Sequence, residues 1–198
     1  MKRESLLGTI PNVLTTLRLV AAPVVGYCVL NSYYDIAVGL FGMAGLLDAA
    51  DGYIARKFDQ GSVLGSYMDP LADKMLVGCT TVAVACQHLI NPWLAGLIIG
   101  RDIVLMAGVV YLRWKTKPPG VSFLAFSDPT SLSATPSTIS KVNTGTTIGL
   151  ITCSLTYAAW AIPDVLVLDA LSATVAVTTL WSGAQYVKDR DKYTLSKK

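Results

Sequence analysis

Four aspartates between residues 48 and 73 are the side chains in this sequence best suited to chemistry. Asp48 and Asp51 are three residues apart and Asp69 and Asp73 are four apart, so each pair would share one face of a helix. Apolar runs flank the segment on both sides. A carboxylate at membrane depth is costly and usually faces a bundle interior or a watery cavity. The pattern predicts a site for a hard divalent cation, Mg²⁺ or Mn²⁺, inside a membrane-embedded helix bundle.

Two glycines and an arginine lie among these carboxylates. Gly52 and Gly65 remove side chains beside the aspartates, so a bulky ligand can approach the backbone. Arg56 adds a planar cation suited to phosphate. Metal, glycines and arginine together indicate a phosphate ester as the ligand. The alternative interpretation is a solvated polar hairpin between two helices, and the cost of buried charge argues against it.

The same segment resembles the signature of the CDP-alcohol phosphotransferases. It reads Asp48-x2-Asp51-Gly52-x2-Ala55-Arg56-x8-Gly65-x3-Asp69-x3-Asp73, and every position of the signature is matched. The resemblance implies phosphoryl transfer with two divalent ions held by the four aspartates, and it makes Asp73 the general base for the acceptor hydroxyl. It also implies that Gly52, Ala55, Arg56 and Gly65 bind the CDP group.

Composition places the chain among membrane proteins. Hydrophobic residues make up 53% of its 198 residues, charged residues only 15%, and the mean hydropathy is +0.51. We expect an all-α fold, a polytopic membrane bundle of about six transmembrane helices that occupies residues 1–198 as a single domain. The basic residues flank the apolar runs and do not form a soluble patch, which excludes nucleic-acid binding.

Six apolar stretches have about the length that a bilayer requires. We expect spans at residues 12–30, 34–57, 62–89, 93–114, 140–162 and 165–187. Before them, residues 1–10 form a short basic segment, either interfacial or frayed; between the fourth and fifth spans, residues 115–139 form a long polar loop, for which a lid is one interpretation. Lys and Arg gather at alternate span ends, so both termini and the four aspartates are expected on the cytoplasmic or matrix side.

Further candidates for binding lie at other spans. The stretch PNVLTTLR resembles an early P-N-x-x-T-x-x-R segment of the family, which makes Asn12 and Thr15 candidates for CDP binding. Candidates for the acceptor phosphate are Arg18, Arg101, Arg113, Lys141 and Asn143.

Alternatives remain open for three of the cations. Arg18 could instead snorkel to the interface. Arg101 could form a structural pair with Asp102 in the middle of the fourth span. Lys74, next to Asp73, is expected to face the surface.

Segments outside the signature, among them VLGSYMDPLADK, IIGRDIVL, YLRWKT and ISKVNT, resemble cardiolipin synthases of the eukaryotic type. This resemblance covers nearly the whole chain. It implies that CDP-diacylglycerol donates a phosphatidyl group to phosphatidylglycerol, with release of CMP. It further implies a homodimer in contact with membrane lipids in the mitochondrial inner membrane, with the site facing the matrix; a bacterial plasma membrane with a cytoplasmic site is the alternative.

Two other functions stay open. Phosphatidylglycerophosphate synthases, which use glycerol-3-phosphate, usually open the fifth span with G-K-x-K-T, where this chain has Ser140 and Asn143. One fewer cation fits an acceptor with less phosphate charge, which favours phosphatidylglycerol. A non-enzymatic transporter would also place carboxylates inside the membrane, but here they cluster on one side and do not follow a pathway.

Overall fold

The computed structural model describes the backbone of residues 10–58, 63–116 and 138–195, and the side chains of residues 14–48, 71–108, 110 and 138–185. These ranges contain helices and no strand, so the all-α prediction is confirmed for them. The six helices are α1 (Ile10–Leu30), α2 (Tyr34–Phe58), α3 (Val63–Cys86), α4 (Pro92–Thr116), α5 (Thr138–Trp160) and α6 (Val165–Leu195). The expected N-terminal interfacial segment and most of the expected polar loop lie outside the described residues.

The helix bounds follow the apolar stretches closely and differ at two ends. α3 ends at Cys86, earlier than predicted, because the chain turns at His88, whose φ of 56° is left-handed. The amide of Leu89 then donates to the carbonyl of Val84, which satisfies an otherwise orphaned helix-end acceptor. α6 continues to Leu195, beyond the expected end of the sixth span.

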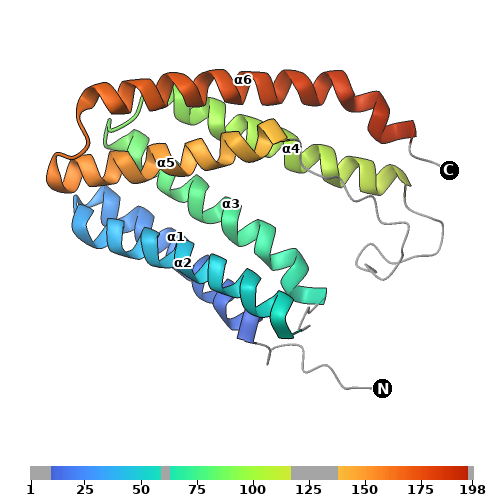
Figure 1. The fold of residues 1–198 in the computed structure, drawn as a ribbon, viewed down its shortest axis with the longest axis horizontal. Coiled ribbons are helices and arrows are strands. Elements are labelled where there is room, and N and C mark those ends of the chain that lie inside the picture. The colour runs from blue at the N-terminus through green and yellow to red at the C-terminus, as the bar shows by residue number, and fades with distance from the viewer. Residues whose placement is uncertain (1–9, 59–62, 117–137, 196–198) are drawn as a thin grey trace.

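Consecutive helices run in opposite directions, so α1, α3 and α5 end at one end of the bundle (Figure 1). A left-handed residue follows each of these three helices: Ser32, His88 and Ala161. The turns at this end carry no Lys or Arg, whereas the start of α1 and the end of α6 lie at the opposite, basic end (Figure 1). The topology therefore brings the start of α1, the end of α2, the start of α3 and the end of α6 to the same end of the bundle.

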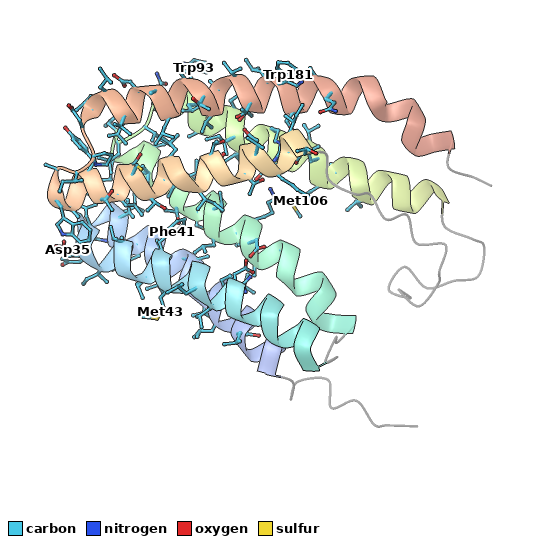
Figure 2. The ribbon with its side chains drawn as sticks, in the orientation of Figure 1. Asp35, Phe41, Met43, Trp93, Met106 and Trp181 are labelled. Atoms are coloured by element: carbon cyan, nitrogen blue, oxygen red, sulfur yellow. The ribbon has the colours of Figure 1, made fainter. Side chains whose placement is uncertain are left out.

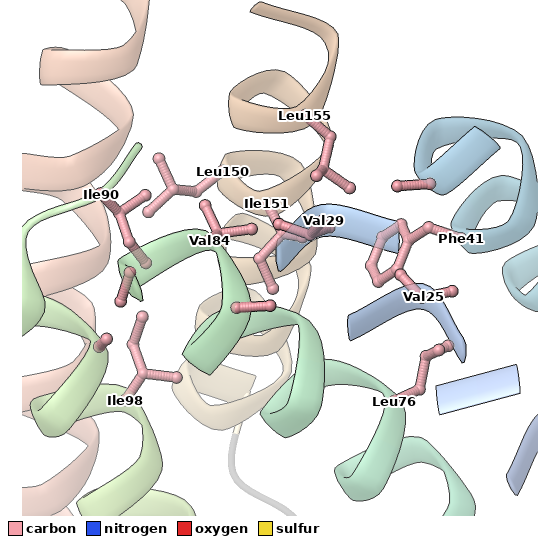
Figure 3. Packing of buried hydrophobic residues seen from close by; sticks show 14 of the residues in the cluster. Val25, Val29, Phe41, Leu76, Val84, Ile90, Ile98, Leu150, Ile151 and Leu155 are labelled. Carbon is pink, nitrogen blue, oxygen red and sulfur yellow. The ribbon is translucent and has the colours of Figure 1, made fainter. Parts of the chain in front are cut away.

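A continuous apolar core joins the helices (Figure 3). Val25 and Val29 of α1 and Phe41 of α2 pack with residues of α3 and α5, while Ile90 and Ile98 extend the cluster toward α4. α1 and α3 are in contact at Gly26, where a Cβ would make an ordinary van der Waals contact with the backbone oxygen of Cys79 at 3.7 Å. α1 packs mainly against α3 and α2.

Large apolar side chains also cover the outside of the helices. Met43, Trp93 and Trp181 project outward, whereas Phe41 points into the bundle (Figure 2). Small polar residues take interior positions: Thr80, Thr81, Thr147, Ser154, Thr179 and Ser182 are buried. Several threonines donate to the carbonyl one turn earlier, as Thr80 does to Leu76 at 2.8 Å.

Within the part of the chain that the structure describes, one stretch, Val165–Gln185, is both long and apolar enough to cross a membrane.

Candidate active site

Two of the four signature aspartates meet an arginine from a third helix. The Nη1 atom of Arg18 in α1 lies 2.7 Å from Oδ1 of Asp48 in α2 and 2.6 Å from Oδ1 of Asp73 in α3. The arginine side chain is 1% exposed, whereas the aspartates are 54% and 49% exposed. The carboxylates therefore form an accessible surface above a buried cation.

Helix periodicity explains this convergence. Asp48 continues the inward face of α2 on which Ala37, Phe41 and Ala44 are buried, at spacings of three and four residues. Asp73 lies on a face of α3 that continues through the buried Leu76. Each aspartate thus lies at the basic end of an apolar stripe, so packing of the helices brings the two carboxylates together.

Asp48 and Asp73 fit a hard divalent cation. Their two Oδ1 atoms both lie within hydrogen-bonding distance of one nitrogen, so their separation cannot exceed the sum of those two distances. Oxygen ligands lie about 2.1 Å from Mg²⁺, so small movements would let both carboxylates bind one ion. Among the described residues no group of three or more His, Cys, Asp or Glu side chains is found.

Most other signature residues are placed only by their helices. Asp51, Gly52, Ala55 and Arg56 follow Asp48 in α2, and Gly65 and Asp69 precede Asp73 in α3. Their side chains lie outside the described residues, as do those of Asn12 in α1 and Arg113 in α4. Their assignments to metal, CDP or acceptor binding stay predictions. Thr15 is described and fully buried, one turn before Arg18.

A second set of polar contacts joins four helices, and we name it the polar junction: Lys74, Arg101, Asp102, Ser140 and Ser182. Arg101 donates from Nη1 to Asp102 at 2.6 Å and from Nη2 to the hydroxyls of Ser140 at 2.5 Å and Ser182 at 3.0 Å. The other Asp102 oxygen accepts from Lys74 at 2.7 Å. The sequence alone predicts neither Lys74 nor Ser182 as a partner of this pair.

The expectation that Lys74 faces the surface is wrong. Its side chain is partly buried and reaches across to α4, where Nζ donates at 2.7 Å to Oδ2 of Asp102, while Arg101 contacts Oδ1. The sequence left two roles open for Arg101, a pair with Asp102 or binding of an acceptor phosphate. The structure shows the pair with Asp102. Its Nε atom is buried without a hydrogen-bond partner. Whether Arg101 also binds an acceptor phosphate stays a prediction.

The two candidates at the start of α5 differ in environment. Lys141 is exposed, in the first turn of the helix. Asn143 is buried, and its Oδ1 atom accepts hydrogen bonds from Thr178 at 2.7 Å and Thr179 at 2.8 Å, both in α6. The two threonines lie in an apolar run, where no local pattern signals this contact. Lys141 can reach a ligand from the surface, while the oxygen of Asn143 ties α5 to α6.

Comparison with known families identifies the family of this chain. A family model described as CDP-alcohol phosphatidyltransferase matches residues 8–181, a range that includes Arg18, Asp48 and Asp73. The chain belongs to the CDP-alcohol phosphatidyltransferase family. The predicted family is thereby confirmed.

Individual members of the CDP-alcohol phosphatidyltransferase family are similar over most of this chain. The cardiolipin synthase (CMP-forming) of Homo sapiens is 39% identical over 181 residues, 90% of this chain and 60% of that protein. A Schizosaccharomyces pombe cardiolipin synthase (CMP-forming) / mitochondrial hydrolase fusion protein is 40% identical over 188 residues, 93% of this chain and 31% of that protein.

A plant protein that is named for a different activity is also similar. The chloroplastic CDP-diacylglycerol–glycerol-3-phosphate 3-phosphatidyltransferase 1 of Oryza sativa subsp. japonica is 36% identical over 191 residues, 93% of this chain and 57% of that protein. The chain therefore spans between 31% and 60% of the length of these three relatives.

Proposed function

We propose that this chain is a cardiolipin synthase of the CMP-forming type, which transfers a phosphatidyl group from CDP-diacylglycerol to phosphatidylglycerol. The observation that carries the proposal is the convergence of Asp48 and Asp73 on one cationic nitrogen, inside a domain of the CDP-alcohol phosphatidyltransferase family. Cardiolipin synthases that match 90% or more of the chain support the choice of acceptor.

The chemistry requires neutralisation of the donor pyrophosphate and activation of an acceptor hydroxyl. The resemblance implies two divalent ions, Mg²⁺ or Mn²⁺. When bound, such ions would stabilise the negative charge on the leaving CMP. Asp48, Asp51, Asp69 and Asp73 hold the ions in this proposal. Asp73 also accepts the proton of the acceptor hydroxyl, and its half-exposed carboxylate is open to such a contact.

Residues around the aspartates bind the two lipids in this proposal. The CDP group is bound by Asn12, Thr15, Gly52, Ala55, Arg56 and Gly65. Exposed Lys141 contacts the acceptor phosphate from the first turn of α5, where the positive end of the helix also favours an anion.

The environment of Asn143 supports phosphatidylglycerol as the acceptor. Asn143 is buried, and its side-chain oxygen accepts hydrogen bonds from two threonine hydroxyls. By the resemblance, phosphatidylglycerophosphate synthases usually carry lysine at this position, where this chain has a neutral amide. An acceptor with a single phosphodiester charge needs fewer cations than glycerol-3-phosphate. We therefore favour phosphatidylglycerol over glycerol-3-phosphate.

The proposal places all six helices across a membrane. Large apolar side chains are exposed along the outer faces of the helices while threonine, serine and arginine lie inside, which suits a lipid environment. The shortest helix, α1, has 21 residues and would span roughly 30 Å, the thickness of a hydrocarbon core. The site would then face the matrix side of the mitochondrial inner membrane. Assembly as a homodimer is part of the proposal.

Acceptor choice is the decisive experiment. Purified protein in lipid nanodiscs would receive CDP-diacylglycerol and Mg²⁺ with either phosphatidylglycerol or glycerol-3-phosphate, and CMP and lipid products would be measured. We expect cardiolipin and CMP only with phosphatidylglycerol, and neither after metal chelation. Product only from glycerol-3-phosphate would replace the proposal with phosphatidylglycerophosphate synthesis. Absence of CMP release with both acceptors would favour a non-enzymatic membrane protein.

A further inference from the structure

Arg18 lies where an apolar residue would be expected. The inward face of α1 carries Thr15, Ala22, Val25 and Val29, all fully buried, and Arg18 completes their spacing of three and four residues. Arg18 occupies the same face and is 1% exposed. A charged side chain in such a position is retained only with charged or polar partners. Its function should therefore be sought in what it contacts inside the bundle.

Two of the four signature carboxylates are among its contacts, and the same nitrogen of Arg18 makes both of these. Nη1 lies within 2.7 Å of Asp48 and 2.6 Å of Asp73. The arginine approaches from the buried side, and both carboxylates keep about half of their surface exposed. Each carboxylate has two oxygens with further lone pairs, so contact with Arg18 leaves capacity for another cation.

We propose that Arg18 is a positioning residue that holds Asp48 and Asp73 in the arrangement required by a divalent cation. This inference rests on the metal dependence of the proposed function. It differs from the acceptor-phosphate role expected from the sequence, because the guanidinium is directed at carboxylates and is shielded from the accessible side.

Electrostatics gives the reason for such a residue. Two carboxylates as close as Asp48 and Asp73 repel each other until a metal ion binds, and repulsion would separate the ends of α2 and α3. A fixed cation beneath them offsets this repulsion and keeps both oxygens near one point. Groups that orient metal ligands in this way typically raise metal affinity by about 10- to 100-fold.

Because one nitrogen makes both of these carboxylate contacts, the proposal predicts different Mn²⁺ affinities for two substitutions of Arg18. Arg18→Gln removes the charge, and we expect it to raise the Mn²⁺ dissociation constant at least about tenfold. Arg18→Lys keeps a positive charge on a single nitrogen, and we expect it to weaken Mn²⁺ binding by less than about tenfold. Mn²⁺ binding to the metal-free full chain in nanodiscs would be measured by electron paramagnetic resonance, without any turnover.

Arg101→Gln is the matched control, because Arg101 is also a buried arginine paired with an aspartate. It should lower thermal stability and leave Mn²⁺ affinity unchanged. If Arg18→Gln fails to fold, a tenfold loss of affinity in Arg18→Lys would by itself overturn the proposal.

The remaining outcomes separate this proposal from the function itself. Unchanged Mn²⁺ affinity in a folded Arg18→Gln protein would show that the arginine is only structural, and tighter binding would show that it competes with the metal. Either result overturns the positioning role and leaves the proposed function intact. If the unmodified chain binds no Mn²⁺, the metal dependence of the proposed function fails as well.

Discussion

Replacing Asp102 with asparagine tests how much the charge of Asp102 contributes to the polar junction, where it pairs with Arg101 of its own helix and with Lys74 of α3. Asp102 accepts from Arg101 at 2.6 Å and from Lys74 at 2.7 Å, so its charge serves two cations on two helices. Asparagine has nearly the same shape and keeps one acceptor oxygen, but it loses the negative charge. The substitution therefore changes the electrostatics of the junction with little change in packing.

The burial of the two cations sets the expected magnitude. The Arg101 side chain is 6% exposed, and deleting one partner of a buried pair costs about 3–5 kcal/mol. Because asparagine retains a neutral hydrogen bond of roughly half the strength, we expect a loss of about 2 kcal/mol from this contact. Lys74 is 32% exposed, so its contact contributes less than about 1 kcal/mol. Asp102→Asn should thus cost about 2–3 kcal/mol, and Lys74→Met less than about 1 kcal/mol.

Unfolding with sodium dodecyl sulfate in mixed micelles, followed by circular dichroism, measures these free energies. Asp35→Asn is the control, because Asp35 is exposed in the first turn of α2 and should change stability little. The double variant Lys74→Met/Asp102→Asn should cost less than the sum of the two single changes. A stability of Asp102→Asn equal to that of the control, or a larger loss in Lys74→Met, would refute the role assigned to Asp102.

Three further substitutions, one of them with a matched control, test other parts of the structure. Asp73→Asn should reduce turnover at least about 100-fold, and CDP-lipid binding, measured by ligand-induced thermal shift, should fall far less; turnover within about tenfold of the unmodified protein would contradict the general-base role. Lys141→Ala should raise the KM for phosphatidylglycerol more than that for CDP-diacylglycerol in steady-state assays, and equal effects on both would remove Lys141 from the acceptor site. Leu150→Ala, at a fully buried position of α5, should cost about 2–5 kcal/mol in the same unfolding titration. Leu166→Ala, at a 76% exposed position, should cost little, and comparable losses at the two sites would contradict the assigned core.

The helices were predictable because long apolar stretches separated by polar turns carry a strong signal. The residues at which the helices end were less predictable. The early end of α3 depends on a left-handed residue at His88, a position without glycine, which no sequence pattern marks. The continuation of α6 to Leu195 passes through charged residues, and hydropathy alone stops before them.

The site was partly predictable for a similar reason. Spacing within each helix places Asp48 and Asp73 on inward faces, but the rotation of one helix against another depends on packing along its whole length. The contacts of Arg18 with two other helices and of Lys74 with Asp102 follow from those rotations. Ser182 and the two threonines that contact Asn143 lie in an apolar run, where hydroxyl residues have many other uses.

The alternating direction of the helices has a practical consequence for topology measurements. An even number of antiparallel helices brings Ile10 and Leu195 to the same end of the bundle (Figure 1). If all six helices cross the bilayer, two halves of a split fluorescent protein fused to the two chain ends would meet in one compartment and complement each other. The same halves fused to one chain end and to the turn between α5 and α6 would stay separated by the lipid. Fluorescence from intact cells could therefore count the crossings as odd or even without purification of the protein.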